Sequence, residues 1–86
     1  MPYRIELTTA ARRQLRSLPA REQTRVGQTI DELATDPRPP GSQKLAGLEN
    51  QWRVRVGDYR IIYEVRDRVL LVLVIRIGHR RDIYRR

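Results

Sequence analysis

The segment from Gln51 to Arg86 (QWRVRVGDYRIIYEVRDRVLLVLVIRIGHRRDIYRR) constrains the fold of this chain more than any other segment. Apolar and basic residues alternate strictly from Trp52 to Val56, which is the pattern of a strand with one buried and one exposed face. The pair Gly57-Asp58 then predicts a two-residue hairpin turn of type I′ or II′. Because pairing counts outward from such a turn, Arg55 should lie directly opposite Arg60.

The two faces of this predicted hairpin differ in character. Two arginines opposite each other on a sheet repel at a cost of roughly 0.2–1 kcal/mol, and a bound anion would relieve that repulsion. The other face carries Trp52 opposite Tyr63, which is typical of a face that packs on a core. The hairpin therefore predicts one face that builds the core and one that binds an anion such as phosphate.

The rest of the chain predicts one small α+β domain spanning residues 1–86. Residues 3–7 alternate as a short strand, residues 10–18 form an amphipathic helix, and residues 19–36 form a second helix that the following prolines end. Residues 69–77 are apolar on both faces, as expected of a strand inside a sheet. We expect the order β-α-α-β-β-β, with a helical hairpin packed on one face of a curved, mostly antiparallel four-stranded sheet.

The charge of the chain is concentrated towards its C-terminus. Residues 53–86 carry ten arginines and four acidic residues, which gives +6 of the formal net charge of +8. Such a surface attracts a polyanion, either nucleic acid or an acidic protein. The alternative is an ordinary solvated surface, which is what runs of charge usually are.

Composition also excludes several sites and compartments. The chain has no Cys and one His, so a disulfide, a thiolate metal site or a zinc site is not expected, and we predict no cofactor and no metal. The N-terminus lacks the apolar region of a signal peptide, and no apolar run has the length of a membrane span. We therefore expect a soluble cytoplasmic protein.

Metal-free RNA cleavage is the chemistry that these residues support. The sequence offers no Ser-His-Asp arrangement, Walker loop, dinucleotide fingerprint or paired carboxylates. If a ribose 2′-OH attacks its own neighbouring phosphate, the protein supplies only charge stabilisation, orientation and proton transfer. The planar, bidentate phosphate partners expected to hold the scissile phosphate are Arg53, Arg55, Arg60 and Arg80.

Proton transfer needs a different residue type, because arginine does not deprotonate in proteins. His79 and Tyr84 are the titratable candidates. His79 is equally consistent with a structural role, and Tyr84 with stacking on a base. Further basic residues expected to contact RNA are Lys44, Arg81, Arg85 and Arg86.

The motifs WRVRVGDYRIIYEV, KLAGL upstream and VLVIRIGHRRDIY downstream resemble the RelE toxins of the RelE/ParE superfamily over essentially the whole chain. The resemblance implies a toxin that enters the ribosomal A site and cuts mRNA there without a metal, which inhibits translation. It also implies inhibition by a cognate RelB-type antitoxin in a hetero-oligomeric complex. The ribosome and its mRNA are then the other partners.

The resemblance assigns the family's functional positions residue by residue. The family's basic pair, next-strand arginine, post-strand arginine and C-terminal tyrosine fall on Arg53, Arg55, Arg60, Arg80 and Tyr84. The best-known pattern has lysine at the first two positions, and a lysine pKa can be lowered until the residue acts as a base, whereas an arginine cannot. The general acid and base therefore stay unassigned, and His79 is a candidate for that role.

Two other functions fit the same sequence. ParE-type relatives share the fold, act on DNA gyrase and generally lack the basic-plus-tyrosine set, so Arg60, Arg80 and Tyr84 favour the ribonuclease. A basic protein that only binds nucleic acid or an antitoxin, without activity, would present the same face.

Overall fold

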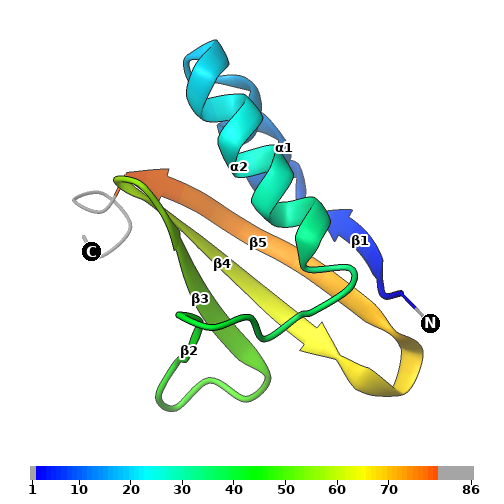
Figure 1. The fold of residues 1–86 in the computed structure, drawn as a ribbon. Coiled ribbons are helices and arrows are strands. Elements are labelled where there is room, and N and C mark those ends of the chain that lie inside the picture. Colours follow the sequence, from blue (N-terminus) through cyan, green and yellow to red (C-terminus); the bar gives the residue numbers. More distant parts are fainter. Residues whose placement is uncertain (1, 80–86) are drawn as a thin grey trace.

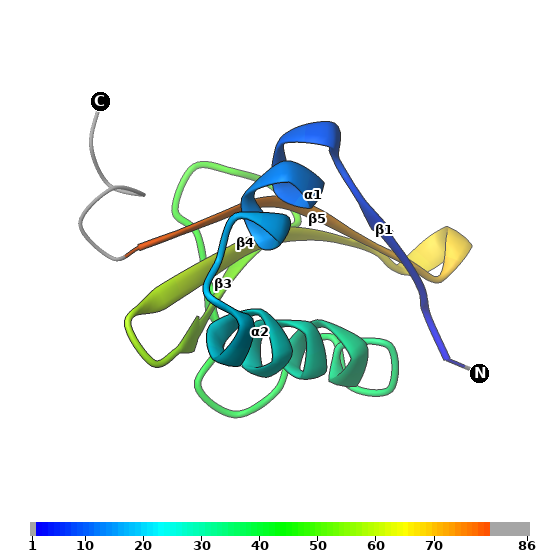
Figure 2. The same cartoon turned by 90° about the horizontal axis from the view of Figure 1, so that it is seen from above.

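The computed structural model describes residues 2–79, which form a mixed five-stranded sheet with two helices on one face (Figure 1). The elements are β1 (Arg4–Leu7), α1 (Thr9–Arg16), α2 (Ala20–Glu32), β2 (Gln43–Lys44), β3 (Gln51–Val56), β4 (Tyr59–Arg66), the 3₁₀ turn η1 (Asp67–Val69) and β5 (Leu71–His79). Seen from above the helices, α1 lies along β5 and α2 lies on the side of β3 (Figure 2). Neither described helix has the length and apolar character needed to cross a membrane.

The sheet order is β1-β5-β4-β3-β2, with β1 parallel to β5 and the other pairs antiparallel. The predicted α+β class, with a helical hairpin on one face of the sheet, is confirmed. The strand count is five instead of four, because Gln43 and Lys44 pair with Arg53 and Trp52 as a short edge strand. Strand β5 lies between β1 and β4, as its apolar character on both faces predicts.

The predicted hairpin between β3 and β4 is confirmed at the level of single pairs. Arg55 lies opposite Arg60 and Trp52 lies opposite Tyr63. Gly57 opens the turn with a φ of 59°, a left-handed value that glycine adopts without a steric penalty. The turn therefore sets the register, and the register sets which side chains share a face.

The core lies between the helices and the sheet. Its fully or almost fully buried side chains are Ala11, Val26, Ile30, Leu33, Val54, Val56, Ile61, Tyr63, Val65, Val72, Val74 and Ile77. Helix α2 ends at Glu32, before the expected limit of Asp36, because the chain tightens into i→i+3 hydrogen bonds there. The amide of Leu33 donates to Ile30 at 3.0 Å in the first of these turns.

A β-bulge in β5 changes which side chains face the helices. Ile62 pairs with Arg76 while Tyr63 pairs with Val74, so Ile75 is an extra residue on β5. The carbonyl of Ile75 accepts a hydrogen bond from the Thr8 hydroxyl at 2.7 Å. Beyond this bulge, the alternation of β5 is shifted by one residue relative to the part before it.

Side chains of α1 complete the edge of β5 beyond the end of β1. Thr8 caps the helix by accepting from the amide of Ala11 at 3.0 Å. Gln14 Oε1 accepts from the amide of Ile77 at 2.7 Å. These bonds attach the helical layer to one side of the sheet, and neither described helix covers the opposite side.

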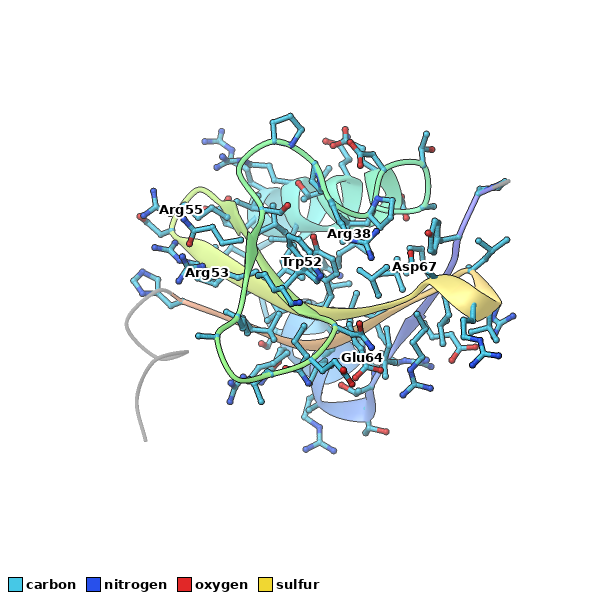
Figure 3. The ribbon with its side chains drawn as sticks, turned by 90° about the horizontal axis from the view of Figure 1, so that it is seen from below. Arg38, Trp52, Arg53, Arg55, Glu64 and Asp67 are labelled. Carbon is cyan, nitrogen blue, oxygen red and sulfur yellow. The ribbon has the colours of Figure 1, made fainter. Side chains whose placement is uncertain are left out.

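The proline-rich loop after α2 is held on the sheet through Pro37 and Arg38. The buried Tyr63 hydroxyl donates to the carbonyl of Pro37 at 2.7 Å, and burial raises the pKa of Tyr63 to about 12. The Arg38 guanidinium lies 5.4 Å from the Trp52 ring centroid and 2.7 Å from a carboxylate oxygen of Asp67 (Figure 3). Hydrogen bonding to Arg38 is the main reason that the pKa of Asp67 is lowered. The loop is thereby fixed as it leads into β2.

Candidate functional site

Side chains of all five strands share the sheet face that points away from the helices, here called the outer face. Cross-strand partners project to the same side, so the register of the sheet fixes this set. Its polar members, together with Ile62, are Arg4, Glu6, Gln43, Gln51, Arg53, Arg55, Arg60, Glu64, Arg66 and Arg76. Three of the arginines predicted to hold a phosphate are therefore brought together on one surface.

Charge on the outer face is segregated along the strands. At the end farther from the hairpin turn, Arg66 forms an ion pair with Glu64. At the hairpin end, the arginines that make no salt bridge with an acidic residue of the described range 2–79 are Arg55, Arg60 and Arg76. Figure 3 shows Arg53 and Arg55 together at one end of the molecule, away from Glu64. Positive charge thus accumulates where the chain does not neutralise it.

Arg60 differs from its neighbours because it is 6% exposed although it faces away from the helices. Its Nε is buried and has no hydrogen-bond partner in the part of the chain that the structure describes. Ile62, two residues along β4, is also buried at 5% without belonging to the core. An unpaired buried donor costs about 1–3 kcal/mol, so a bound anion that accepts from Arg60 would remove that cost.

Arg53 lies beside a cavity at the β2 edge of the outer face. Its Nη2 donates a hydrogen bond to Oε1 of Gln43, the residue opposite it in the sheet. The cavity has a volume of about 350 Å³, and its lining residues are Pro40, Gly41, Gln43, Arg53, Val54 and Arg55. Sequence reasoning missed Gln43, because a two-residue strand is too short to show alternation.

Lys44 is not brought together with the arginines. It pairs with Trp52, so its side chain projects to the face that carries the core residues of β3. One position earlier in β2, Gln43 projects to the outer face instead. The residue of β2 that accompanies the arginines is therefore an amide and not a cation.

His79 lies on the opposite face from the arginines. It pairs with Tyr59, and the two rings meet edge to face, with centroids 5.7 Å apart and an angle of 82°. Both residues line a second cavity of about 350 Å³ beside α1. The sheet therefore separates the imidazole from Arg55 and Arg60, although Gly78 is the direct partner of Arg60.

Five predicted site residues lie outside the described residues 2–79, so no position is given to them here. They are Arg80, Arg81, Tyr84, Arg85 and Arg86. Within the described range, no group of three or more His, Cys, Asp or Glu side chains comes together as a metal site would require.

Comparisons with known proteins agree with this architecture. Residues 5–84 match the family described as ParE toxin of type II toxin-antitoxin system, parDE. The chain is 37% identical to Toxin RelG of Mycobacterium tuberculosis over the whole of both chains. It is 25% identical to the putative toxin RelE1 of Methanocaldococcus jannaschii, covering 99% of this chain and 98% of the relative.

Solved structures of toxin–antitoxin complexes share the fold. The toxin–antitoxin complex RelBE2 from Mycobacterium tuberculosis contains a chain with a TM-score of 0.80 and 31% identity, covering 92% of this chain and 99% of that chain. The archaeal RelE–RelB complex from Pyrococcus horikoshii gives a TM-score of 0.83 and 29% identity, covering 93% and 97%.

The fold and these matches define a toxin of a type II toxin–antitoxin system. Within that class, the chain belongs to the RelE/ParE superfamily, and it is a RelE-type toxin. The family resemblance seen in the sequence is confirmed at this level.

Proposed function

We propose that this toxin is a metal-independent endoribonuclease that cleaves mRNA in the ribosomal A site and so inhibits translation. The observation that carries the proposal is the pair of Arg55 and Arg60, directly opposite each other at the end of the outer face where no described acid neutralises them. The buried, unpaired Nε of Arg60 gives a phosphate oxygen a preorganised donor. The RelE names of the relatives favour the same activity.

In the proposed reaction, the ribose 2′-OH attacks the adjacent phosphorus and the 5′-oxygen of the next nucleotide leaves, which produces a 2′,3′-cyclic phosphate end. Arg60 donates to a non-bridging oxygen from β4, while Arg53 and Arg55 contact the same phosphate from the neighbouring strand β3. Their charges stabilise the extra negative charge of the pentacoordinate transition state, and a single such donor is typically worth ~10²–10³ in rate. The proposal includes Arg80 in the same role.

Proton transfer completes the proposed mechanism. The arginines stay protonated, so the 2′-OH must lose its proton to another group, and the departing 5′-oxygen must gain a proton to leave as a 5′-OH. Of the two titratable candidates on this chain, Tyr84 is the one proposed, because the sheet separates the His79 imidazole from Arg55 and Arg60. Contacts to the ribosome and mRNA are assigned to the basic residues Arg81, Arg85 and Arg86. Lys44, which projects to the other face of β2, is assigned a contact away from the reacting nucleotide.

We further propose that a RelB-type antitoxin binds this toxin as a hetero-oligomer. The similar solved structures include complexes of RelE with RelB. The net charge of +8 favours an acidic docking segment, whose attraction to the toxin weakens as salt screens it.

Mapping the 5′ ends of cellular mRNA after induced expression tests the proposed activity. We expect cuts inside codons on a translated message and none on the same message without its start codon. Arg60→Met should remove the cuts, whereas Arg66→Met, a change on the same face of the same strand, should leave them. Intact translated message during growth arrest would contradict the proposal.

Inhibition of DNA gyrase is the second candidate function, because the matching family is described as a ParE toxin. A supercoiling assay with purified gyrase and the toxin separates the two. Inhibited supercoiling and DNA breaks, with intact message, would favour gyrase as the target. Unchanged supercoiling at toxin concentrations that arrest translation would exclude it. Intact message and unchanged supercoiling together would favour a non-catalytic binding protein.

A further inference from the structure

We propose that the cavity beside Gln43 is a nucleobase subsite, in which the Gln43 carboxamide reads the base next to the phosphate held by the arginines. This inference rests on the proposed ribonuclease function and adds a residue that selects among RNA sequences. It assigns Gln43, the first residue of β2, to contact the RNA base and not the core or the phosphate.

The cavity has the size and walls that a flat, partly apolar group requires. Its volume of about 350 Å³ lies within the range of about 300–1,000 Å³ that is usual for small-ligand sites. Its lining includes Pro40 and Gly41 from the loop before β2 and Arg53 and Arg55 from β3. Gly41 has a φ of 95°, so the backbone conformation of that loop depends on glycine. A phosphate needs no apolar wall, whereas a base stacks on proline or on a guanidinium plane.

The carboxamide of Gln43 has hydrogen-bonding capacity left for a ligand. Its Oε1 accepts from Arg53, which orients the side chain. The Nε2 group makes no hydrogen bond with any residue in the described range 2–79, and it offers two N–H donors. On the base edge that faces the major groove of a duplex, guanine presents the acceptors O6 and N7 and uracil presents O4, and these match the two donors. Cytosine presents its amino group on that edge, which does not match them.

The position of Gln43 relative to the phosphate site supports the same assignment. Gln43 lies directly opposite Arg53, and Arg55 follows two residues later on the same face of β3, about 7 Å along the strand. A nucleotide whose phosphate contacts Arg55 and Arg60 can therefore direct its own or the neighbouring base towards Gln43. The outer face of neighbouring strands thus provides both the contact to the phosphate and the contact that selects the base.

Binding of nucleotides to the full-length toxin tests the subsite without requiring catalysis. The probes are the four nucleoside 3′-monophosphates and inorganic phosphate, and the signal is the NMR resonance of the Gln43 side-chain amide. We expect guanosine and uridine monophosphates to shift this resonance and to bind about tenfold more tightly than cytidine monophosphate. Gln43→Leu should abolish that difference. The subsite is refuted if inorganic phosphate shifts the Gln43 amide resonance as much as any nucleotide does. It is also refuted if Gln43→Leu binds each of the four nucleotides with the affinity of wild type.

Cleavage on ribosomes programmed with different A-site codons provides the second test. Gln43→Glu replaces donors by acceptors and should shift the relative rates about tenfold towards codons with cytosine, since a carboxylate accepts from the cytosine amino group. Gln51→Leu is the matched control, because Gln51 lies on the same face of β3 away from the cavity, and its codon profile should equal that of wild type. An unchanged profile in Gln43→Glu would refute the subsite. If wild type itself cuts no codon, the ribonuclease proposal fails, and the binding test still decides whether a base binds at Gln43.

Discussion

Replacing Arg60 with methionine tests whether the buried arginine is kept for its ligand or for the fold. Methionine retains the apolar stem and removes the guanidinium. The structure shows two costs that the change removes: the buried Nε without a partner, about 1–3 kcal/mol, and the repulsion from Arg55, roughly 0.2–1 kcal/mol. We therefore expect the free energy of unfolding to rise by about 1–4 kcal/mol. In a domain of this size 1 kcal/mol shifts Tm by about 4–8 °C, so the increase should be easy to measure.

The same change should lower the rate of cleavage by ~10²–10³, because it removes a donor to the transition state. Chemical unfolding in urea and single-turnover cleavage on programmed ribosomes measure the two effects on one protein. Arg66→Met is the control: Arg66 is half-exposed on the same strand and paired with Glu64, so its loss should change stability by less than about 0.5 kcal/mol and leave cleavage intact.

Added phosphate provides an internal check on this reasoning. An anion that binds the folded protein raises Tm, so phosphate should stabilise the wild type more than Arg60→Met. If Arg60→Met unfolds at a lower urea concentration than wild type, the guanidinium supports the fold and the reasoning is refuted. If phosphate raises the Tm of both proteins equally, the anion does not bind at Arg60.

Three further changes test other parts of the structure. Asp67→Asn should lower Tm at neutral pH, because the Asp67 carboxylate stabilises the fold while it is charged beside Arg38. The difference in Tm from wild type should disappear as pH falls through the lowered pKa of Asp67. A difference in Tm that persists at pH 2 would contradict this. Tyr63→Phe leaves the Pro37 carbonyl unpaired and should cost about 1–3 kcal/mol in urea unfolding, whereas an unchanged midpoint would mean that water replaces the hydroxyl. His79→Gln should leave the rate and the pH profile of cleavage unchanged, because the imidazole lies on the other face of the sheet; a changed profile would identify it as the proton carrier.

The sequence by itself determined the elements whose cause is local. The turn at Gly57 and the alternation around it sufficed to pair Arg55 with Arg60, because a two-residue hairpin leaves no freedom in register. The apolar character of residues 71–75 on both faces placed β5 inside the sheet for an equally direct reason, since neither of its faces could be left in water. The common face of the three predicted arginines of β3 and β4 follows from the hairpin.

Only the tertiary structure decided the features that depend on contacts between distant segments. Arg60 is buried although it faces away from the helices, and the residue pattern of β4 does not predict this burial. The role of Gln43 depends on a two-residue strand that exists only because β3 offers it an edge. The parallel pairing of β1 with β5 likewise joins segments at opposite ends of the chain.

The position of His79 shows most clearly how one tertiary feature changes a reading of the sequence. Regular alternation from Val72 and Val74, which face the helices, would place His79 on the outer face with the arginines. The bulge at Ile75 inserts one residue into β5, and a shift of one residue sends every later side chain to the other face. Thr8 bonds to the Ile75 carbonyl at that bulge, and β1 has ended just before it. The imidazole therefore meets Tyr59 because of a bulge that lies against the N-cap of α1, and no periodicity in β5 could reveal it.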